Sequence, residues 1–224
     1  MSGRAPDQAP TLWLASASPR RRALLAAAGL RFEVRPADVE ERVDEAEGPR
    51  GTAERLARLK AEAVAERLAS EGRAGLVLGA DTVVAMQQRV LGKPANRQAA
   101  AAMLWDLSGR THQVWTGVAV VGVGSGAGTE VLESFVVCSA VRFAPLTESL
   151  VAAYVDSGEG FDKAGGYAIQ GRLGRRLVAG FQGSFSNVVG LPLAETLAAL
   201  ARHGLRAPHD AVEVERAVRR EAGW

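Results

Sequence analysis

The chain has 224 residues with a formal net charge of +2, and 47% of the residues are hydrophobic, which allows a substantial core in one sizeable domain or two small lobes. No run approaches the roughly 20 apolar residues of a membrane span, and residues 1–10 lack the apolar segment of a signal peptide. The single cysteine excludes an intrachain disulfide. We therefore expect a cytoplasmic protein, and the small net charge gives no indication of nucleic-acid binding.

Strand-like and helix-like periodicities alternate along the chain, which indicates an α/β or α+β domain. In chain order, the predicted elements are a strand at 11–16, a helix at 18–29, a strand at 31–36, an acidic loop at 38–48, a helix at 52–70, a strand at 75–86, a short strand at 89–91, a helix at 96–107, strands at 111–123 and 129–143, a helix at 147–157, a glycine-rich loop at 158–171 and a helix at 192–204.

We expect one domain at 11–204, preceded by a disordered extension at 1–10. Residues 205–224 form a charged tail that either frays or folds into a short helix. The helix at 52–70 is amphipathic, and its predicted apolar stripe consists of Leu56, Leu59, Ala63, Ala65 and Leu68.

The stretch ASASPRRR at 15–22 poses a problem in electrostatics. Ser18 suits the N-cap of a helix and Pro19 suits its first position, so three arginines fall in the first turn. This is the positive end of the helix dipole, where each cation is disfavoured by roughly 0.3–1 kcal/mol.

Asp81 follows an apolar run at 75–79 that is typical of a strand buried on both faces. An unpaired carboxylate there would cost several kcal/mol, so Asp81 needs a metal, a cation or a place at a strand end that faces a cleft. The alternative is a turn aspartate or a hydrogen-bond acceptor in the core.

Two further stretches combine charge with restricted or permissive backbone. Lys93 stands between a glycine and a proline, which indicates either a fixed functional position or an ordinary surface turn. The loop at 161–171 contains an acid, a base and an amide, and its glycines would allow a ligand close to the backbone, although a solvated loop has the same composition. Arginine greatly outnumbers lysine, and the three lysines that remain are Lys60, Lys93 and Lys163.

Six stretches, in order, resemble the Maf family of nucleoside triphosphate pyrophosphatases. They are LASASPRR at 14–21, GADTV at 79–83, GKP at 92–94, SGRTH at 108–112, DKAGGYAIQG at 162–171 and VVGLPL at 188–193. The resemblance extends from Leu12 to about Gly204. It implies an α/β fold in which a mixed β-sheet with flanking helices forms two lobes around a central nucleotide-binding cleft, in a protein that is commonly a homodimer.

The resemblance also implies a reaction. Proteins of this family cleave a nucleoside triphosphate between the α- and β-phosphates with a divalent cation, Mg²⁺ or Mn²⁺. By resemblance Asp81 is the catalytic base and also a metal ligand, together with Glu41. The residues implied to bind the phosphates or line the cleft are Ser16, Ser18, Arg20, Arg21, Lys60, Lys93 and Lys163. A polyanion at the helix start would then supply the negative charge that the arginines lack.

Three positions resemble the branch of the family that acts on dTTP and UTP, namely Arg20, Thr82 and Gln170. The branch that acts on 7-methyl-GTP typically has tryptophan, glutamine and glutamate there. The amide of Gln170 offers both a donor and an acceptor to the imide edge of a pyrimidine, normal or modified.

The alternative is a non-enzymatic regulator, linked to cell division, that binds nucleotides or nucleic acid through its arginines. Carboxylates at Glu40, Glu41 and Asp81 would repel nucleic-acid phosphates without a metal, so we expect a nucleoside triphosphate partner and no nucleic acid or membrane.

Overall fold

A computed structural model describes residues 9–126 and 128–224. Most of the predicted disordered extension, residues 1–8, lies outside the described residues. The strands are β1 (Leu12–Leu14), β2 (Glu33–Val34), β3 (Gly75–Met86), β4 (Arg89–Leu91), β5 (Thr111–Val123), β6 (Thr129–Phe143) and β7 (Val178–Gln182). They form one mixed seven-stranded open sheet. Six strands follow the order β2-β1-β3-β5-β6-β7, and the seventh, β4, pairs with the C-terminal end of β3.

The sheet is parallel where β1 joins β2 and β3, and antiparallel from β3 through β5 and β6 to β7. The α-helices are α1 (Pro19–Ala27), α2 (Gly48–Ser70), α3 (Arg97–Leu107), α4 (Glu148–Ser157), α5 (Gly174–Leu177), α6 (Phe185–Val189), α7 (Leu193–Arg202) and α8 (Ala211–Glu221). Two short 3₁₀ turns are at Glu45–Glu47 and Ala164–Gly166.

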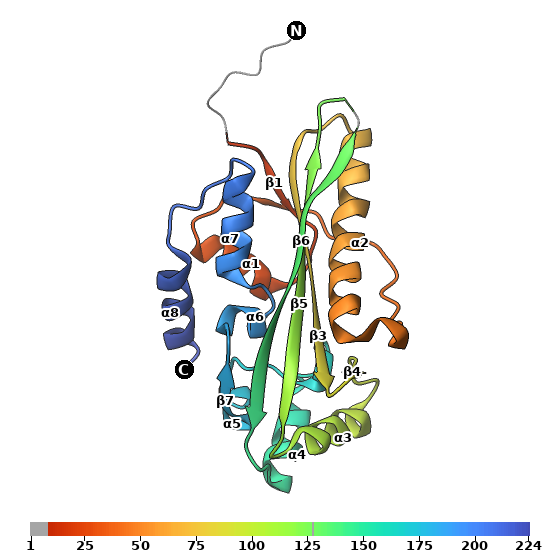
Figure 1. Ribbon diagram of the computed structural model, residues 1–224. Helices are drawn as coiled ribbons and strands as arrows, with labels where there is room; N and C mark the ends of the chain where they lie inside the picture. Colours follow the sequence, from red (N-terminus) through yellow and green to blue (C-terminus); the bar gives the residue numbers. More distant parts are fainter. Residues whose placement is uncertain (1–8, 127) are drawn as a thin grey trace.

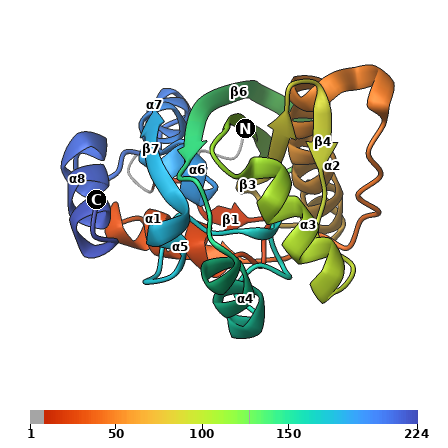
Figure 2. The same cartoon turned by 90° about the horizontal axis from the view of Figure 1, so that it is seen from below.

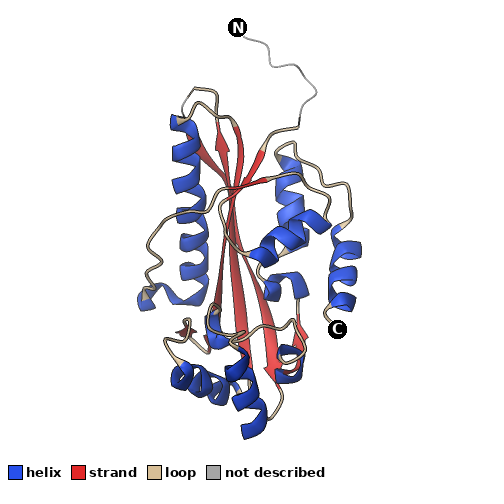
Figure 3. Cartoon of the chain, turned by 180° about the vertical axis from the view of Figure 1, so that it is seen from behind, coloured by secondary structure: helices blue, strands red, loops and turns tan. Residues whose placement is uncertain are grey.

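Helices lie on both sides of the sheet (Figures 1 and 3). Helix α2 runs along one face, while α1, α6, α7 and α8 gather on the other, and α3, α4 and α5 lie towards the far end of the long strands. Seen from below, the sheet separates α2 from α7 and α8 (Figure 2). This arrangement confirms the predicted α/β class with a mixed sheet and flanking helices. Among the described residues, no helix is long and apolar enough to cross a membrane.

Helix α2 lies directly on the sheet because glycines leave room for its backbone. A Cβ atom at Gly79 would lie 2.3 Å from the carbonyl oxygen of Ala57, and one at Gly117 would lie 2.1 Å from that of Ala53. The predicted stripe is wrong in part, since Leu59 and Ala63 are only half-buried. The helix approaches through alanines, so its buried face is rotated away from these two positions and includes Ala53, Ala57, Lys60, Ala61 and Val64.

Most predicted elements are confirmed, and several differ at their ends. The strands at 111–123 and 129–143 are observed with those bounds, whereas α2 starts at Gly48, one turn before the prediction. The prediction missed α5, β7 and α6, all between residues 174 and 189. Of the two alternatives for 205–224, the structure has a helix, α8.

Ser18 occupies the predicted N-cap position of α1, and Pro19 follows it in the first turn. The predicted cap hydrogen bond is nevertheless wrong, because the Ser18 hydroxyl accepts none from the helix. Instead the Ser18 N–H donates to Oγ of Ser16 at 3.3 Å. The Ser18 hydroxyl consequently stays available at the edge of the cavity described next.

Candidate active site

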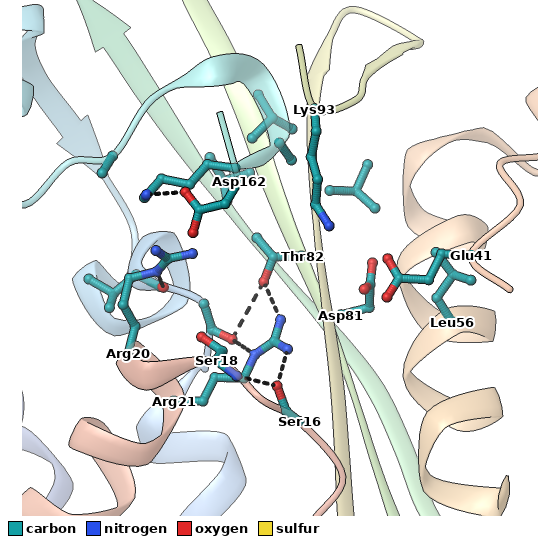
Figure 4. Close-up of a pocket in the computed structure, with 18 of the residues that line it drawn as sticks. Ser16, Ser18, Arg20, Arg21, Glu41, Leu56, Asp81, Thr82, Lys93 and Asp162 are labelled. Carbon is teal, nitrogen blue, oxygen red and sulfur yellow. Dashed lines mark hydrogen bonds and ion pairs between the residues drawn. The ribbon is translucent and has the colours of Figure 1, made fainter. Parts of the chain in front are cut away.

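A cavity of about 650 Å³ lies between the start of α1, the inner face of α2, the middle of β3 and the loop that follows α4. Figure 4 shows its charged side chains converging from these elements. Every site residue predicted from the sequence lines this cavity: Ser16, Ser18, Arg20, Arg21, Glu41, Lys60, Asp81, Thr82, Lys93, Lys163 and Gln170. These residues come from four of the six motifs and include all three lysines, and Val188, Val189 and Gly190 of a fifth motif also line the cavity.

Two carboxylates and a lysine occupy the α2 side of the cavity. Nζ of Lys60 lies 2.6 Å from Oδ1 of Asp81 and 2.7 Å from Oε1 of Glu41. Lys60 is 8% exposed and Asp81 is 7% exposed. Asp81 therefore has the cation that its burial requires. It lies in the middle of β3, opposite Gly117 of β5, rather than at a strand end.

Glu41 reaches this cluster from the loop before α2. Its partial burial acts to raise its pKa, but the hydrogen bond from Lys60 and the charges of Lys60, Lys93 and Arg21 outweigh burial, and the net pKa of Glu41 is lowered. Glu41 is thus held as a carboxylate beside the cavity, close to Asp81 in Figure 4.

Arg21 is buried at the opposite side of the cavity floor. Its Nε donates to the carbonyl oxygen of Gly190 at 2.8 Å, and Nη1 donates to Oγ of Ser16 at 2.9 Å. Nη2 donates to Oγ1 of Thr82 at 3.1 Å. Burial lowers the pKa of Arg21, against the attraction of Asp81, but a guanidinium remains charged in proteins. Arg21 is therefore a fixed cation in the wall.

Arg20 is more accessible. Its Nε donates to the carbonyl oxygen of Val189 at 3.3 Å. Within the described part of the chain, its two Nη atoms donate to no protein acceptor. The carbonyl oxygen of Val189 in α6 holds Nε of Arg20. The two Nη atoms can therefore form two parallel hydrogen bonds to a phosphate.

Thr82 makes contacts within the protein. Besides accepting from Arg21, its hydroxyl lies 3.0 Å from Oγ1 of Thr116, and it donates to the carbonyl oxygen of Gly190 at 3.4 Å. These contacts make Thr82 a support for Arg21. Its predicted part in substrate choice stays a prediction.

The loop after α4 and the segment after β4 form the third side of the cavity. Lys93 is exposed and extends into it (Figure 4). Lys163 donates to the carboxylate of Asp162 and to the carbonyl oxygen of Glu159. Burial acts to raise the pKa of Asp162, and the hydrogen bond and charge of Lys163 lower it overall. In the described residues the Gln170 amide has no protein partner, which leaves its donor and its acceptor free for a ligand.

The residues that hold this loop are not among the predicted site residues. The hydroxyl of Tyr154 accepts from the N–H of Ala168 at 2.9 Å, and that of Tyr167 lies 2.7 Å from Nε2 of His112. Burial lowers the pKa of His112 to about 4, so this ring is neutral. His112 and Tyr167 each lie in one of the six motifs. They are 55 residues apart in the chain, so no local pattern predicts that they form a pair.

The acidic side of the cavity suits a hard divalent cation. No group of three or more His, Cys, Asp or Glu side chains in the described ranges could hold a metal by itself. Magnesium is commonly bound through one or two carboxylates, with substrate phosphates and waters completing its shell. Glu41 and Asp81 supply two such carboxylates, and the ammonium of Lys60 already places a positive charge between them. The donor set therefore fits a Mg²⁺ or Mn²⁺ ion that arrives with a triphosphate.

Comparisons with known proteins show what the whole chain is similar to. The family model for Maf-like proteins matches residues 11–203. A dTTP/UTP pyrophosphatase of Myxococcus xanthus is 50% identical over 88% of this chain and 94% of its own length. Relatives of the same name are 50% identical in an Anaeromyxobacter species, over 89% of this chain and 93% of the relative, and in Moorella thermoacetica, over 87% and 95%.

Proposed function

The chain belongs to the Maf-like family, and on that premise we propose that it is a pyrophosphatase that hydrolyses dTTP and UTP to the nucleoside monophosphate and pyrophosphate. The observation that carries the proposal is the pair of opposed charge clusters across one cavity. The Asp81, Lys60 and Glu41 cluster faces the two guanidinium groups of Arg20 and Arg21. The choice of dTTP and UTP is supported by the names of relatives that are 50% identical.

The triphosphate binds along the arginine side. Arg20 offers its free outer edge, Arg21 supplies a buried positive charge, and Ser18 adds a hydroxyl at the start of α1. The first N–H groups of α1 and its dipole also favour an anion at this end. Together these groups hold the phosphates and leave the α-phosphorus facing Asp81 across the cavity.

Asp81 accepts a proton from the attacking water. The water oxygen bonds to the α-phosphorus, the bond from that phosphorus to the oxygen bridging to the β-phosphate breaks, and pyrophosphate leaves with the electron pair. Lys60 holds the carboxylate of Asp81 in place through the 2.6 Å contact. General-base catalysis of this kind typically contributes about 10²–10⁴-fold to the rate.

Glu41 and Asp81 are the side chains that would hold the divalent cation. A bound Mg²⁺ or Mn²⁺ would neutralise phosphate charge and polarise the phosphoryl group. The protein's own part is to present two carboxylates whose mutual repulsion is relieved by Lys60.

Gln170 reads the base. A thymine or uracil edge presents one N–H donor flanked by carbonyl acceptors, and an amide complements both kinds of group. Thr82 contributes indirectly, because its hydroxyl orients Arg21.

We also propose that the enzyme acts in the cytoplasm, where its free nucleotide substrates are found, as a homodimer without a nucleic-acid partner. Sedimentation of the purified protein with and without UTP tests the dimer directly. A monomer under all conditions would refute it.

Pyrophosphate release from dTTP and UTP in the presence of magnesium tests the activity, with 7-methyl-GTP and GTP as comparison substrates. We expect pyrophosphate as the product and a preference for both pyrimidines. Release of orthophosphate, or a preference for 7-methyl-GTP, would overturn the proposed reaction or the proposed substrate. Tight UTP binding without turnover would instead support a non-enzymatic regulator.

A further inference from the structure

Helix α8 and Trp224, which follow the matched residues 11–203, contact two segments that line the cavity, α6 and the loop at Ile169. The N-terminus of α8 is capped by Asp210, whose carboxylate accepts from the N–H groups of Val212 at 2.8 Å and Glu213 at 3.2 Å. It lies against α1, α6 and α7 (Figure 1). The helix is therefore packed as part of this fold, and two of its neighbours, α1 and α6, carry residues that line the cavity.

Glu215 of α8 holds the start of α6. One carboxylate oxygen accepts from the N–H of Phe185 at 2.6 Å. The other accepts from the hydroxyls of Ser186 at 2.8 Å and Ser184 at 3.2 Å. The first N–H groups of a helix have no partner within the helix, so this carboxylate completes the N-terminus of α6 from outside.

The other end of α6 holds the two arginines of the cavity. The carbonyl oxygens of Val189 and Gly190 accept from Nε of Arg20 and Nε of Arg21. Glu215 and the arginines thus contact opposite ends of the same five-residue helix. A displacement of α6 would therefore move the acceptors of both guanidinium groups.

Trp224, which follows α8, contacts the base side of the cavity. Its Nε1 donates to the carbonyl oxygen of Ile169 at 3.1 Å, and Ile169 is the neighbour of Gln170. The indole ring packs against Phe181 with a centroid separation of 5.4 Å, and the guanidinium of Arg175 lies 4.1 Å from its centroid. The ring contacts Phe181 and Arg175, and these contacts restrict the direction of the indole N–H.

We propose that the segment 211–224, α8 with the residues after it, braces the cavity at two points and that Glu215 and Trp224 are positioning residues. Glu215 positions the phosphate-binding arginines through α6, and Trp224 positions Gln170 through the Ile169 carbonyl. The inference rests on the proposed function, since it assigns the two contacts to the two halves of a nucleoside triphosphate.

Other contacts limit the size of each effect. The side chain of Asn187 anchors the middle of α6 through Nδ2, which donates to the carbonyl oxygen of Val114 and to Oγ of Ser139. The hydroxyl of Tyr154 holds the loop at Ala168. Loss of either brace residue should therefore loosen one half of the site without disordering it.

Two conservative variants distinguish the phosphate-binding part of the cavity from the base-binding part. Glu215→Gln keeps the size of the side chain but removes its charge, and Trp224→Phe keeps a ring but removes the N–H. The matched controls are Glu213→Gln, an exposed position on α8, and Trp105→Phe, an exposed tryptophan on α3. Calorimetric titrations with tripolyphosphate report the phosphate half, and titrations with UMP report the base half together with one phosphate.

We expect Glu215→Gln to weaken tripolyphosphate binding by about tenfold, as for the partial loss of a hydrogen bond to a charged group, because Asn187 still holds α6. We expect Trp224→Phe to weaken UMP by about threefold to tenfold, as for one lost neutral hydrogen bond, with tripolyphosphate unchanged. Both controls should bind both probes like the parent. In steady-state assays the first variant should raise KM for UTP and dTTP alike, and the second should lower the preference for UTP over GTP.

Equal weakening of both probes in the two variants, or normal binding of both, would overturn the proposal and leave α8 as a cover for apolar surface. If Glu215→Gln fails to fold, Glu215→Asp replaces it, with the same expected difference between the probes. The titrations measure binding and not turnover, so a parent protein without pyrophosphatase activity would refute the proposed function while the titrations still decide the brace.

Discussion

Replacing Asp81 with asparagine tests the proposed reaction most directly. The change keeps the shape of the side chain and an oxygen that can accept from Lys60, but it removes the group that accepts a proton from water. If Asp81 is the base, turnover should fall by roughly 10²–10⁴-fold. Since Asp81 and Lys60 are both more than 90% buried, the same change also affects the free energy of unfolding.

Removing one member of a buried ion pair typically costs about 3–5 kcal/mol, because the other charge is left without a partner. Lys60 is not left so, because Glu41 remains 2.7 Å from its Nζ and the asparagine oxygen can replace Oδ1 at the 2.6 Å contact. The expected loss is therefore about 1 kcal/mol, the net value of an ordinary hydrogen bond. A large rate effect with a small stability effect is the signature of a catalytic rather than a structural carboxylate.

The assay is kcat for dTTP at saturating magnesium, with a urea melt and a magnesium titration of the same protein. Asp106→Asn is the matched control, because it removes an exposed carboxylate from an ion pair with Arg89 and should change neither quantity appreciably. Near-normal turnover in Asp81→Asn would refute the general-base role. A rate loss matched by a loss of magnesium affinity would assign Asp81 to metal binding instead, and a loss of 3–5 kcal/mol would show that Glu41 does not compensate.

Three further substitutions test other parts of the site. Gln170→Glu should lower the rate for UTP relative to 7-methyl-GTP, because a carboxylate has no donor for an imide carbonyl, and an unchanged ratio would show that Gln170 does not read the base. Glu41→Gln should raise the magnesium concentration needed for half-maximal activity by roughly tenfold with a smaller effect on kcat at saturation, and an unchanged magnesium requirement would remove Glu41 from the metal site. The pKa of His112 is about 4 in the folded protein against 6.5 ordinarily, so the unfolded state binds a proton that the folded state does not, and stability should fall by about 2 kcal/mol from about pH 7.5 to about pH 5. In His112→Phe this part of the pH dependence should disappear from urea melts, and the same slope in parent and variant would contradict the assignment.

The long elements could be predicted from the sequence because each carries a compositional signal over many residues. The strands at 111–123 and 129–143 are long runs rich in valine and are joined by a glycine-rich turn. The elements missed were α5, β7 and α6, which have four or five residues each. Segments this short have no measurable period, and isolated helices of one turn are unstable. They form here because the remainder of the chain surrounds them, as Glu215 does at the start of α6.

The site could be predicted as a set of residues but not as a set of contacts. Lys60 lies outside all six motifs and was predicted only through the family resemblance, since a lysine on the inner face of α2 conflicts with the apolar pattern of that helix. Its partner Asp81 is 21 residues away in the chain, and Thr82 is 61 residues from Arg21. Such pairs depend on how the helices pack against the sheet, and Gly79 and Gly117, which allow that packing, have no local signature of it.

The arginines at the start of α1 show how packing changes an argument based on one helix. Considered alone, the first turn of α1 is an unfavourable place for cations, and a bound anion was the expected remedy. Part of the unfavourable interaction is compensated within the protein. Arg20 and Arg21 donate to the carbonyl oxygens of Val189 and Gly190, at the negative end of α6. These contacts use Nε of each guanidinium, and for Arg20 they leave the outer nitrogens towards the cavity. The arginines are therefore held in place before the substrate arrives, and within residues 9–126 and 128–224 the outer nitrogens of Arg20 have no protein partner for the phosphates to displace.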